Sequence, residues 1–129
     1  MNRRQSFTTL AAAAISAATP SIAASPGIQL HVDLNVDPAK EKDLLKSYAT
    51  IFMPAIKKQP GFTDVRLMKL RSVAKGTGPA NTNYRLLIGF QTEDQRLKWV
   101  ASDEHRKVWP TIDKNLRGDK LSAVLFDLA

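Results

Sequence analysis

Residues Ile28–Ala55 read IQLHVDLNVDPAKEKDLLKSYATIFMPA, and this stretch changes from a strand pattern to a helix pattern at Pro38. Up to Asp37, apolar and polar residues alternate, which is typical of a half-buried strand. Pro38 suits the first turn of a helix, with Asp37 as its cap. The apolar residues then recur at helical spacing, at Leu44, Leu45, Tyr48, Ile51, Phe52 and Ala55. Pro54 predicts a kink or an early end of this helix, because proline removes a backbone donor.

Three further strand patterns follow this first helix. Gln59-Pro60-Gly61 ends the helix, and strands are predicted over residues 62–73 and 84–91, with a polar loop between them. The second of these strands is almost continuously apolar, so we expect it inside a sheet. The last strand is predicted over residues 121–128.

A second helical pattern precedes the last strand. Thr92 and Gln95 have the spacing of a capping box, and Arg117-Gly118 closes the helix. Ser102-Asp103 predicts a break with a fresh cap, and Pro110 argues against a straight continuous rod. The residues predicted to share its apolar face are Leu97, Val100, Ala101, Val108, Ile112 and Leu116.

The predicted element order, β-α-β-β-α-β, is that of the ferredoxin-like α+β fold. Its four strands form an antiparallel sheet, and both helices cover one face. On the other face, His31 and Arg66 accompany Met68 or Leu70, which is too apolar a mixture to leave in water and too polar for a dry core. We therefore expect two copies to pair through these faces and to enclose a cavity.

The first part of the chain, Met1–Ala24, is predicted to be a removable export signal. Arg3-Arg4 supplies a positive start, Phe7–Ala18 is apolar, and cleavage is expected after Ala23 or Ala24. The apolar stretch is too short to span a bilayer core of ~30 Å. Residues 25–129 would then form one domain, located in the periplasm or secreted.

The export route stays open between two alternatives. The paired arginines resemble a twin-arginine signal, and the low hydrophobicity of the stretch favours that route. Phe7 lies one position later than the twin-arginine pattern places its aromatic residue, which leaves the general secretory route.

Composition excludes several functions. There are no cysteines, so disulfides, thiolate nucleophiles and cysteine-ligated metals are absent. The formal net charge is +7, but no aromatic residues interleave a basic run, so a nucleic-acid partner is not expected. With two histidines and scattered carboxylates, no metal site is expected. Phosphate loops, nucleotide fingerprints and Ser/His/Asp patterns are missing, which disfavours kinases, Rossmann enzymes and hydrolases. After signal removal, no membrane partner is expected.

Three segments together resemble the dimeric α/β-barrel superfamily. They are Gln59-Pro60-Gly61-Phe62, Phe90-Gln91-Thr92-Glu93 and the run from Trp99 through Ser102 and His105 to Trp109. The sequence is most similar to antibiotic biosynthesis monooxygenase (ABM) domains, with stress-responsive α/β-barrel domains next, over Ile28–Leu128. The resemblance implies a homodimer with one pocket per subunit between sheet and helices. Some such proteins insert oxygen into electron-rich aromatic compounds without metal or flavin, some degrade haem, and many have no known reaction.

His105 is the predicted catalytic residue. It lies at the edge of the apolar helix face, where an imidazole could reach a pocket and act as acid or base on a phenolic substrate. A neutral ring nitrogen could instead ligate haem iron. The alternative is that His105 only packs the break at Ser102.

The predicted substrate-binding residues are His31, Asp33, Asn35, Arg66 and Trp109. The first three share the polar side of one strand, and the alternative is that this side faces solvent or a partner subunit. Trp99 and Trp109 are expected on different sides of the second helix, unable to form one platform, and core or interface packing is the alternative role. Haem-degrading relatives place their tryptophan further ahead of the histidine, which disfavours haem.

Three functions follow from this reading. The first is an exported, homodimeric, cofactor-independent oxygenase for a small aromatic or hydrophobic compound. The second is a non-enzymatic module of the same fold that binds a hydrophobic ligand or haem. The third is an assembly domain with no pocket.

Overall fold

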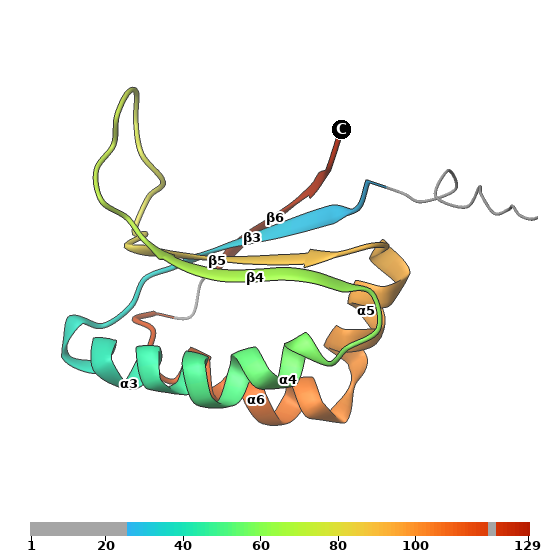
Figure 1. Cartoon of the computed structure of the whole chain (residues 1–129). Coiled ribbons are helices and arrows are strands. Elements are labelled where there is room, and N and C mark those ends of the chain that lie inside the picture. The colour runs from blue at the N-terminus through green and yellow to red at the C-terminus, as the bar shows by residue number, and fades with distance from the viewer. Residues whose placement is uncertain (1–25, 119–120) are drawn as a thin grey trace, which may run out of the picture.

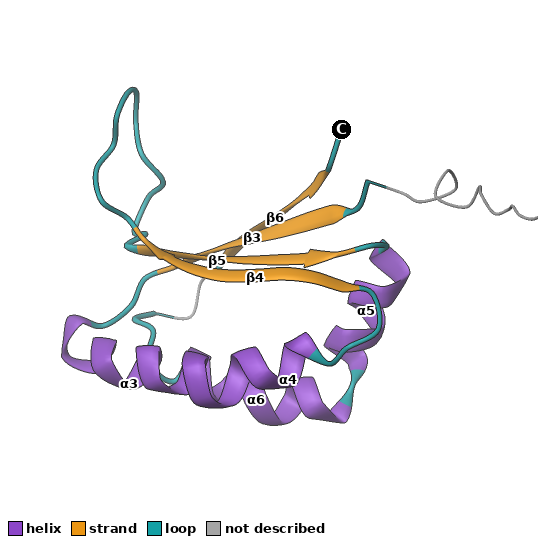
Figure 2. Ribbon diagram, viewed as in Figure 1, coloured by secondary structure: helices purple, strands orange, loops and turns teal. Residues whose placement is uncertain are grey.

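The computed structural model describes residues 26–118 and 121–129, and the predicted export signal, residues 1–24, lies outside them. These residues form an antiparallel four-stranded sheet with the helices on one face (Figure 1). The strands are β3 (Ile28–Leu34), β4 (Phe62–Lys69), β5 (Tyr84–Phe90) and β6 (Ser122–Asp127). The helical layer in Figure 2 holds α3 (Glu41–Ser47), α4 (Met53–Lys57), α5 (Glu93–Ala101) and α6 (Asp103–Asp113). The strand order β4-β5-β3-β6 confirms the predicted ferredoxin-like fold.

The alternation in the first strand is confirmed. Ile28, Val32 and Leu34 are buried beneath the helices and Leu30 packs beside them, while Gln29, His31 and Asp33 lie on the opposite face. The strand ends earlier than predicted, because the side-chain amide of Asn83 takes over the pairing at Val36. Asn83 accepts from the Val36 N–H at 2.8 Å and donates to its carbonyl at 2.9 Å.

The first helical region is continuous past Pro54, so the predicted early end is wrong. Asp37 caps the region as predicted, through a bond from the N–H of Ala39 at 3.0 Å, and a 3₁₀ turn over Pro38–Lys40 leads into α3. A π-helical turn, η3 (Tyr48–Phe52), joins α3 to α4. The nitrogen of Pro54 has no hydrogen to donate to the preceding turn, and the wider hydrogen-bond spacing of the π turn tolerates this missing bond. The helix therefore runs on to Lys57.

The second helical region breaks at Ser102, as predicted. Ser102 has extended backbone angles, and its Oγ accepts a hydrogen bond from the N–H of His105 at 3.1 Å, which begins α6. Pro110 lies inside α6 without ending it.

The predicted apolar face of this region is wrong in its first half. In the subunit, the exposed residues of α5 include Leu97, Val100 and Ala101, whereas Trp99 is buried. In α6, Val108 and Ile112 are buried as predicted. The predicted apolar face assumed one helix axis from Leu97 to Leu116. The axis changes direction at Ser102, so residues before and after the break do not share that face.

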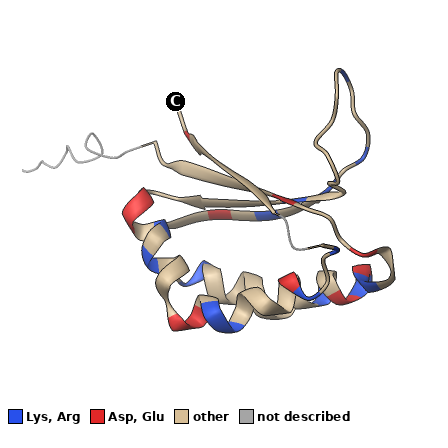
Figure 3. Cartoon of the chain, turned by 180° about the vertical axis from the view of Figure 1, so that it is seen from behind, with Lys and Arg blue, Asp and Glu red and all other residues tan. Residues whose placement is uncertain are grey.

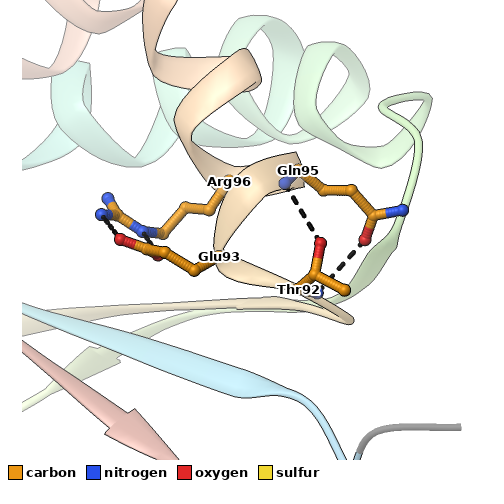
Figure 4. Close-up of polar contacts among 4 residues, drawn as sticks. All are labelled: Thr92, Glu93, Gln95 and Arg96. Carbon is orange, nitrogen blue, oxygen red and sulfur yellow. Dashed lines mark hydrogen bonds and ion pairs between the residues drawn. The ribbon is translucent and has the colours of Figure 1, made fainter.

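A glycine is required where the chain enters β4. Gly61 has a φ of +82°, and a Cβ there would lie 1.9 Å from Oε1 of Gln95. Gln95 belongs to the capping box of α5, in which Thr92 Oγ1 accepts from the Gln95 N–H and Gln95 Oε1 accepts from the Thr92 N–H, both at 3.2 Å (Figure 4). The Pro-Gly-Phe sequence therefore sets the close approach of the β4 turn to α5.

Candidate functional site

An apolar pocket of about 170 Å³ lies between the sheet and the helices. Its floor is the helix-facing side of β3, β5 and β6, with Leu30, Val32 and Ile88 among the lining residues. Its other wall comes from η3, α5 and α6. We call this cavity the aromatic pocket, because three of its helical lining residues are Phe52, Trp99 and Trp109.

His105 lies in the wall of the aromatic pocket between the two tryptophans. Its ring centroid is 5.1 Å from that of Trp99 in an edge-on arrangement, and 6.2 Å from that of Trp109 in a stacked arrangement. Phe52 contacts both tryptophans edge-on, with centroid separations of 6.0 and 6.3 Å. The chain thus holds one aromatic cluster around a single imidazole.

This cluster corrects the expectation that Trp99 and Trp109 lie on different sides, because both line the same pocket, although their rings meet His105 edge-on and stacked and do not form one flat platform. Trp99 lies on α5 and Trp109 on α6, and the turn at Ser102 brings the two helices together at an angle. A continuous helix would have separated the two indoles. The separation of the tryptophans assumed one continuous helix, which conflicts with the predicted break at Ser102. The structure has the break.

The surroundings of His105 favour its neutral form. Burial lowers the pKa of His105 below its usual value of 6.5, and the positive charge of Arg106 lowers that pKa further. A neutral imidazole has one ring nitrogen free to accept a proton. His105 can therefore act as a base near neutral pH.

Arg96 is the second ionisable residue of the aromatic pocket, and sequence reasoning missed it. Arg96 donates through Nε and Nη2 to the two carboxylate oxygens of Glu93, at 2.6 and 2.7 Å (Figure 4). Glu93 raises the pKa of Arg96, and Arg96 lowers the pKa of Glu93. The i,i+3 spacing indicates this ion pair in the sequence, but nothing there shows that Arg96 faces a pocket.

The other predicted site residues lie apart from the aromatic pocket. His31, Asp33 and Arg66 are on the open face of the sheet, which the helices do not cover, so the sheet separates them from His105. Asn35 lies at the end of β3, where it lines a polar pocket with Asp33 and Arg117. Of the six predicted residues, the structure brings together His105 and Trp109. The roles of all six stay predictions.

On the open face, residues paired across neighbouring strands form rows that run across the sheet. In the central row, Arg66 lies opposite Leu87, Leu87 opposite His31, and His31 opposite Val124. Two ion pairs accompany these rows: Arg66 Nε of the central row contacts Asp64 Oδ2 at 2.8 Å, and Arg85 Nε contacts Asp33 Oδ1 at 2.7 Å within a flanking row. The arginines and aspartates of this face therefore compensate one another.

Apolar side chains dominate the β6 side of the open face. Val124 and Phe126 are 48% and 52% exposed, and Phe126 packs edge-on against His31 with a centroid separation of 5.1 Å. Elsewhere, Lys and Arg alternate with Asp and Glu along the helical layer (Figure 3). The open face thus combines large exposed apolar groups with compensated charges.

Residues 26–118 and 121–129 contain neither a metal-site cluster nor a candidate membrane span. No group of three or more His, Asp or Glu side chains there is arranged to hold a metal ion. Within the same residues, no helix combines the length and apolar character needed to cross a bilayer.

The fold and the pocket together define a class of protein, the ferredoxin-like α+β proteins that hold a cavity between sheet and helices. No family model matches the sequence, and a search of curated proteins gives no match. Solved structures do match. A candidate antibiotic biosynthesis monooxygenase from Caulobacter crescentus has a TM-score of 0.64 at 17% identity, covering 81% of this chain and 92% of that one.

Two further structures share the fold. A dimeric ferredoxin-like protein of unknown function from a Jannaschia species has a TM-score of 0.67 at 14% identity, covering 79% of this chain and 99% of that one. A variant of SnoaB, a cofactor-independent oxygenase from Streptomyces nogalater, has a TM-score of 0.60 at 16% identity, covering 79% and 92%. The predicted superfamily resemblance is confirmed at the level of the fold, which this chain shares with ABM-type proteins.

Proposed function

We propose that this chain is a homodimeric monooxygenase of the ABM type that oxidises a small aromatic compound without a bound cofactor. The observation that carries the proposal is the position of His105 between Trp99 and Trp109 in the wall of the aromatic pocket, where burial lowers the pKa of its imidazole. The SnoaB structure, described as a cofactor-independent oxygenase, supports this assignment through its shared fold.

The pocket suits a flat apolar substrate. A cavity of ~150 Å³ with apolar walls binds benzene, so a pocket of about 170 Å³ has room for one or two rings. The indoles of Trp99 and Trp109 and the ring of Phe52 offer edge-on and stacked contacts to such a substrate.

His105 has the chemistry that a phenolic substrate requires. Its free ring nitrogen takes the proton of the phenol O–H, which leaves an electron-rich phenolate. The phenolate donates electrons to dioxygen, and one oxygen atom forms a bond to ring carbon. The second oxygen atom leaves as water, with the proton from the oxidised carbon and the proton that His105 returns. One phenol and one dioxygen thus give one quinone and one water.

The homodimer forms in this proposal through the open face. That face exposes Val124 and Phe126 among compensated ion pairs, so covering it removes apolar surface from water without burying net charge. The Jannaschia protein, described as dimeric, shares the fold. His31, Asp33 and Arg66 would then face the second copy.

We further propose that residues 1–24 direct export, so that the dimer acts in the periplasm or outside the cell.

Oxygen uptake with a panel of phenols and naphthols tests the proposed reaction. The wild type should consume oxygen with at least one of these compounds, and His105→Ala should lose most of that rate. Lys107→Ala is the matched control, because Lys107 is an exposed residue of the same helix, α6, and does not line the pocket. Full activity of His105→Ala would remove its assigned role as base.

Ligand binding without a reaction is the alternative function. The pocket lining is almost entirely apolar, which favours binding of a hydrophobic molecule whether or not it reacts. Saturable quenching of tryptophan fluorescence with no oxygen uptake would support this alternative. In its haem version, titration should give a Soret shift that His105→Ala abolishes, and the absence of any shift would end that version.

A further inference from the structure

The aromatic pocket contains one guanidinium whose hydrogen-bonding capacity is only partly used. Arg96 has five N–H donors, of which one on Nε and one on Nη2 are directed to Glu93. The two N–H groups of Nη1 have no hydrogen-bond partner among the described residues. The Arg96 side chain is only 16% exposed and lines the pocket, so these donors are available to a ligand.

Glu93 decides which kind of ligand group these donors favour. The bidentate contact compensates the charge of Arg96, so the pair is neutral as a unit. A carboxylate brought into the apolar pocket would add an uncompensated negative charge and would lose its hydration. A neutral oxygen avoids that cost and still accepts a charge-assisted hydrogen bond.

The position of Arg96 on α5 sets how such a ligand lies. Arg96 and Trp99 are three residues apart on the same helix, so their side chains are neighbours, and both line the pocket. A ligand with its oxygen at Nη1 can therefore place its ring against the Trp99 indole.

We propose that Arg96 is a specificity-determining residue that selects ligands with a neutral carbonyl oxygen, and that Glu93 excludes carboxylates by compensating the arginine. This inference rests on the proposed pocket and names the substrate class of that site.

Three bicyclic probes test the proposal: indane, 1-indanone and indane-1-carboxylate. Both tryptophans of the chain line the pocket, so quenching of tryptophan fluorescence reports binding there. The wild type should bind 1-indanone about tenfold or more tightly than indane, as expected for a hydrogen bond to a charged group. It should bind the carboxylate no more tightly than indane.

Two variants separate the two parts of the proposal. Arg96→Met should bring the affinities for 1-indanone and indane to within about twofold, because the donor is gone. Glu93→Gln leaves Arg96 with an uncompensated charge, so it should bind the carboxylate about tenfold more tightly than the wild type does. Lys98→Met is the matched control, because Lys98 is an exposed cation of the same helix, α5, and does not line the pocket. It should keep the wild-type preference.

The outcomes distinguish this inference from the proposed function. Equal wild-type affinity for indane and 1-indanone would overturn the selection by Arg96, while the pocket and its oxygen uptake would stand. A preference that survives in Arg96→Met would overturn it as well. An unchanged carboxylate affinity in Glu93→Gln would overturn the role of Glu93. No binding of any probe would overturn both this inference and the pocket on which it rests.

Discussion

The Oγ of Ser102 accepts a hydrogen bond from the backbone N–H of His105 at 3.1 Å and donates one to the carbonyl of Trp99 at 2.6 Å. One hydroxyl therefore ends α5 and begins α6. Because Trp99 and His105 lie on opposite sides of this turn, the edge-on contact between their rings depends on it. The geometry of the proposed base is thus set by a residue that does not line the pocket.

Ser102→Ala should destabilise the protein by about 1 kcal/mol, because the first N–H groups of α6 lose their cap. Urea unfolding monitored by circular dichroism measures this change. Ser102→Thr keeps a hydroxyl at the cap and should recover most of the lost stability. Equal midpoints for the alanine variant and the wild type would show that the cap contributes nothing.

His105 should titrate below pH 6.5, because burial and Arg106 both disfavour its charged form. NMR titration of the two histidine rings measures this, and His31→Gln assigns the signals. Arg106→Gln should raise the midpoint of His105 toward 6.5. The unfolded chain binds this proton near pH 6.5, whereas folded His105 binds it only at lower pH. The free energy of unfolding should therefore fall as pH falls from about 6.5 through the midpoint of folded His105. A midpoint above 6.5 would contradict the neutral base.

Phe52→Ala should lower the free energy of unfolding by about 3–5 kcal/mol, because Phe52 is fully buried and contacts both tryptophans. Ile51→Ala is the matched control on the adjacent residue, which is 40% exposed, and should change stability by about 0.5 kcal/mol or less. Chemical denaturation compares the two variants. Similar losses in both would show that the aromatic cluster does not organise the helical layer.

Tyr84 should resist ionisation. Burial, followed by the hydrogen bond to Glu41 and its charge, raises the pKa of Tyr84 to about 12. In Tyr48→Phe, Tyr84 is the one remaining tyrosine, so the 295 nm absorbance should show a midpoint near that value. The folded state holds this proton more tightly, so its contribution to stability is present below pH 10 and is lost as pH rises from about 10 through about 12. A midpoint near 10 would contradict the buried contact with Glu41.

Phe126→Glu should convert the proposed dimer to a monomer, because it places a charge on the apolar part of the open face. Sedimentation velocity measures the change. Leu97→Glu is the matched control on the helical side, where Leu97 is 49% exposed, and should leave the dimer intact. A wild type that sediments as a monomer at micromolar concentration would contradict the dimer itself.

Local patterns were sufficient for the fold and for part of the site. Alternation along β3, the cap at Asp37 and the capping box at Thr92 each follow from neighbouring residues, and the structure confirms them. The break at Ser102 also follows from such a local pattern. These signals involve residues a few positions apart, which is the range over which sequence patterns specify backbone geometry.

The parts that sequence reasoning missed depend on contacts between distant elements. The burial of Trp99 and its contact with Phe52 require the angle between α5 and α6, which no single pattern contains. The position of Arg96 in the pocket requires the same angle. The continuation of the first helix past Pro54 depends on a π turn, for which the sequence offers no separate signal.

The pairing of β3 with β6 joins Ile28 to Asp127, at the two ends of the described domain. Of the four strands of this sheet, β3 comes first along the chain and β6 last, so β3 waits for β6 before the sheet is complete. Contacts between residues so far apart in the sequence form slowly compared with hairpins and helices. The sheet is therefore complete only once β6 has been made and has joined β3, and deletion of β6 would leave β3, still paired with β5, as an exposed edge strand.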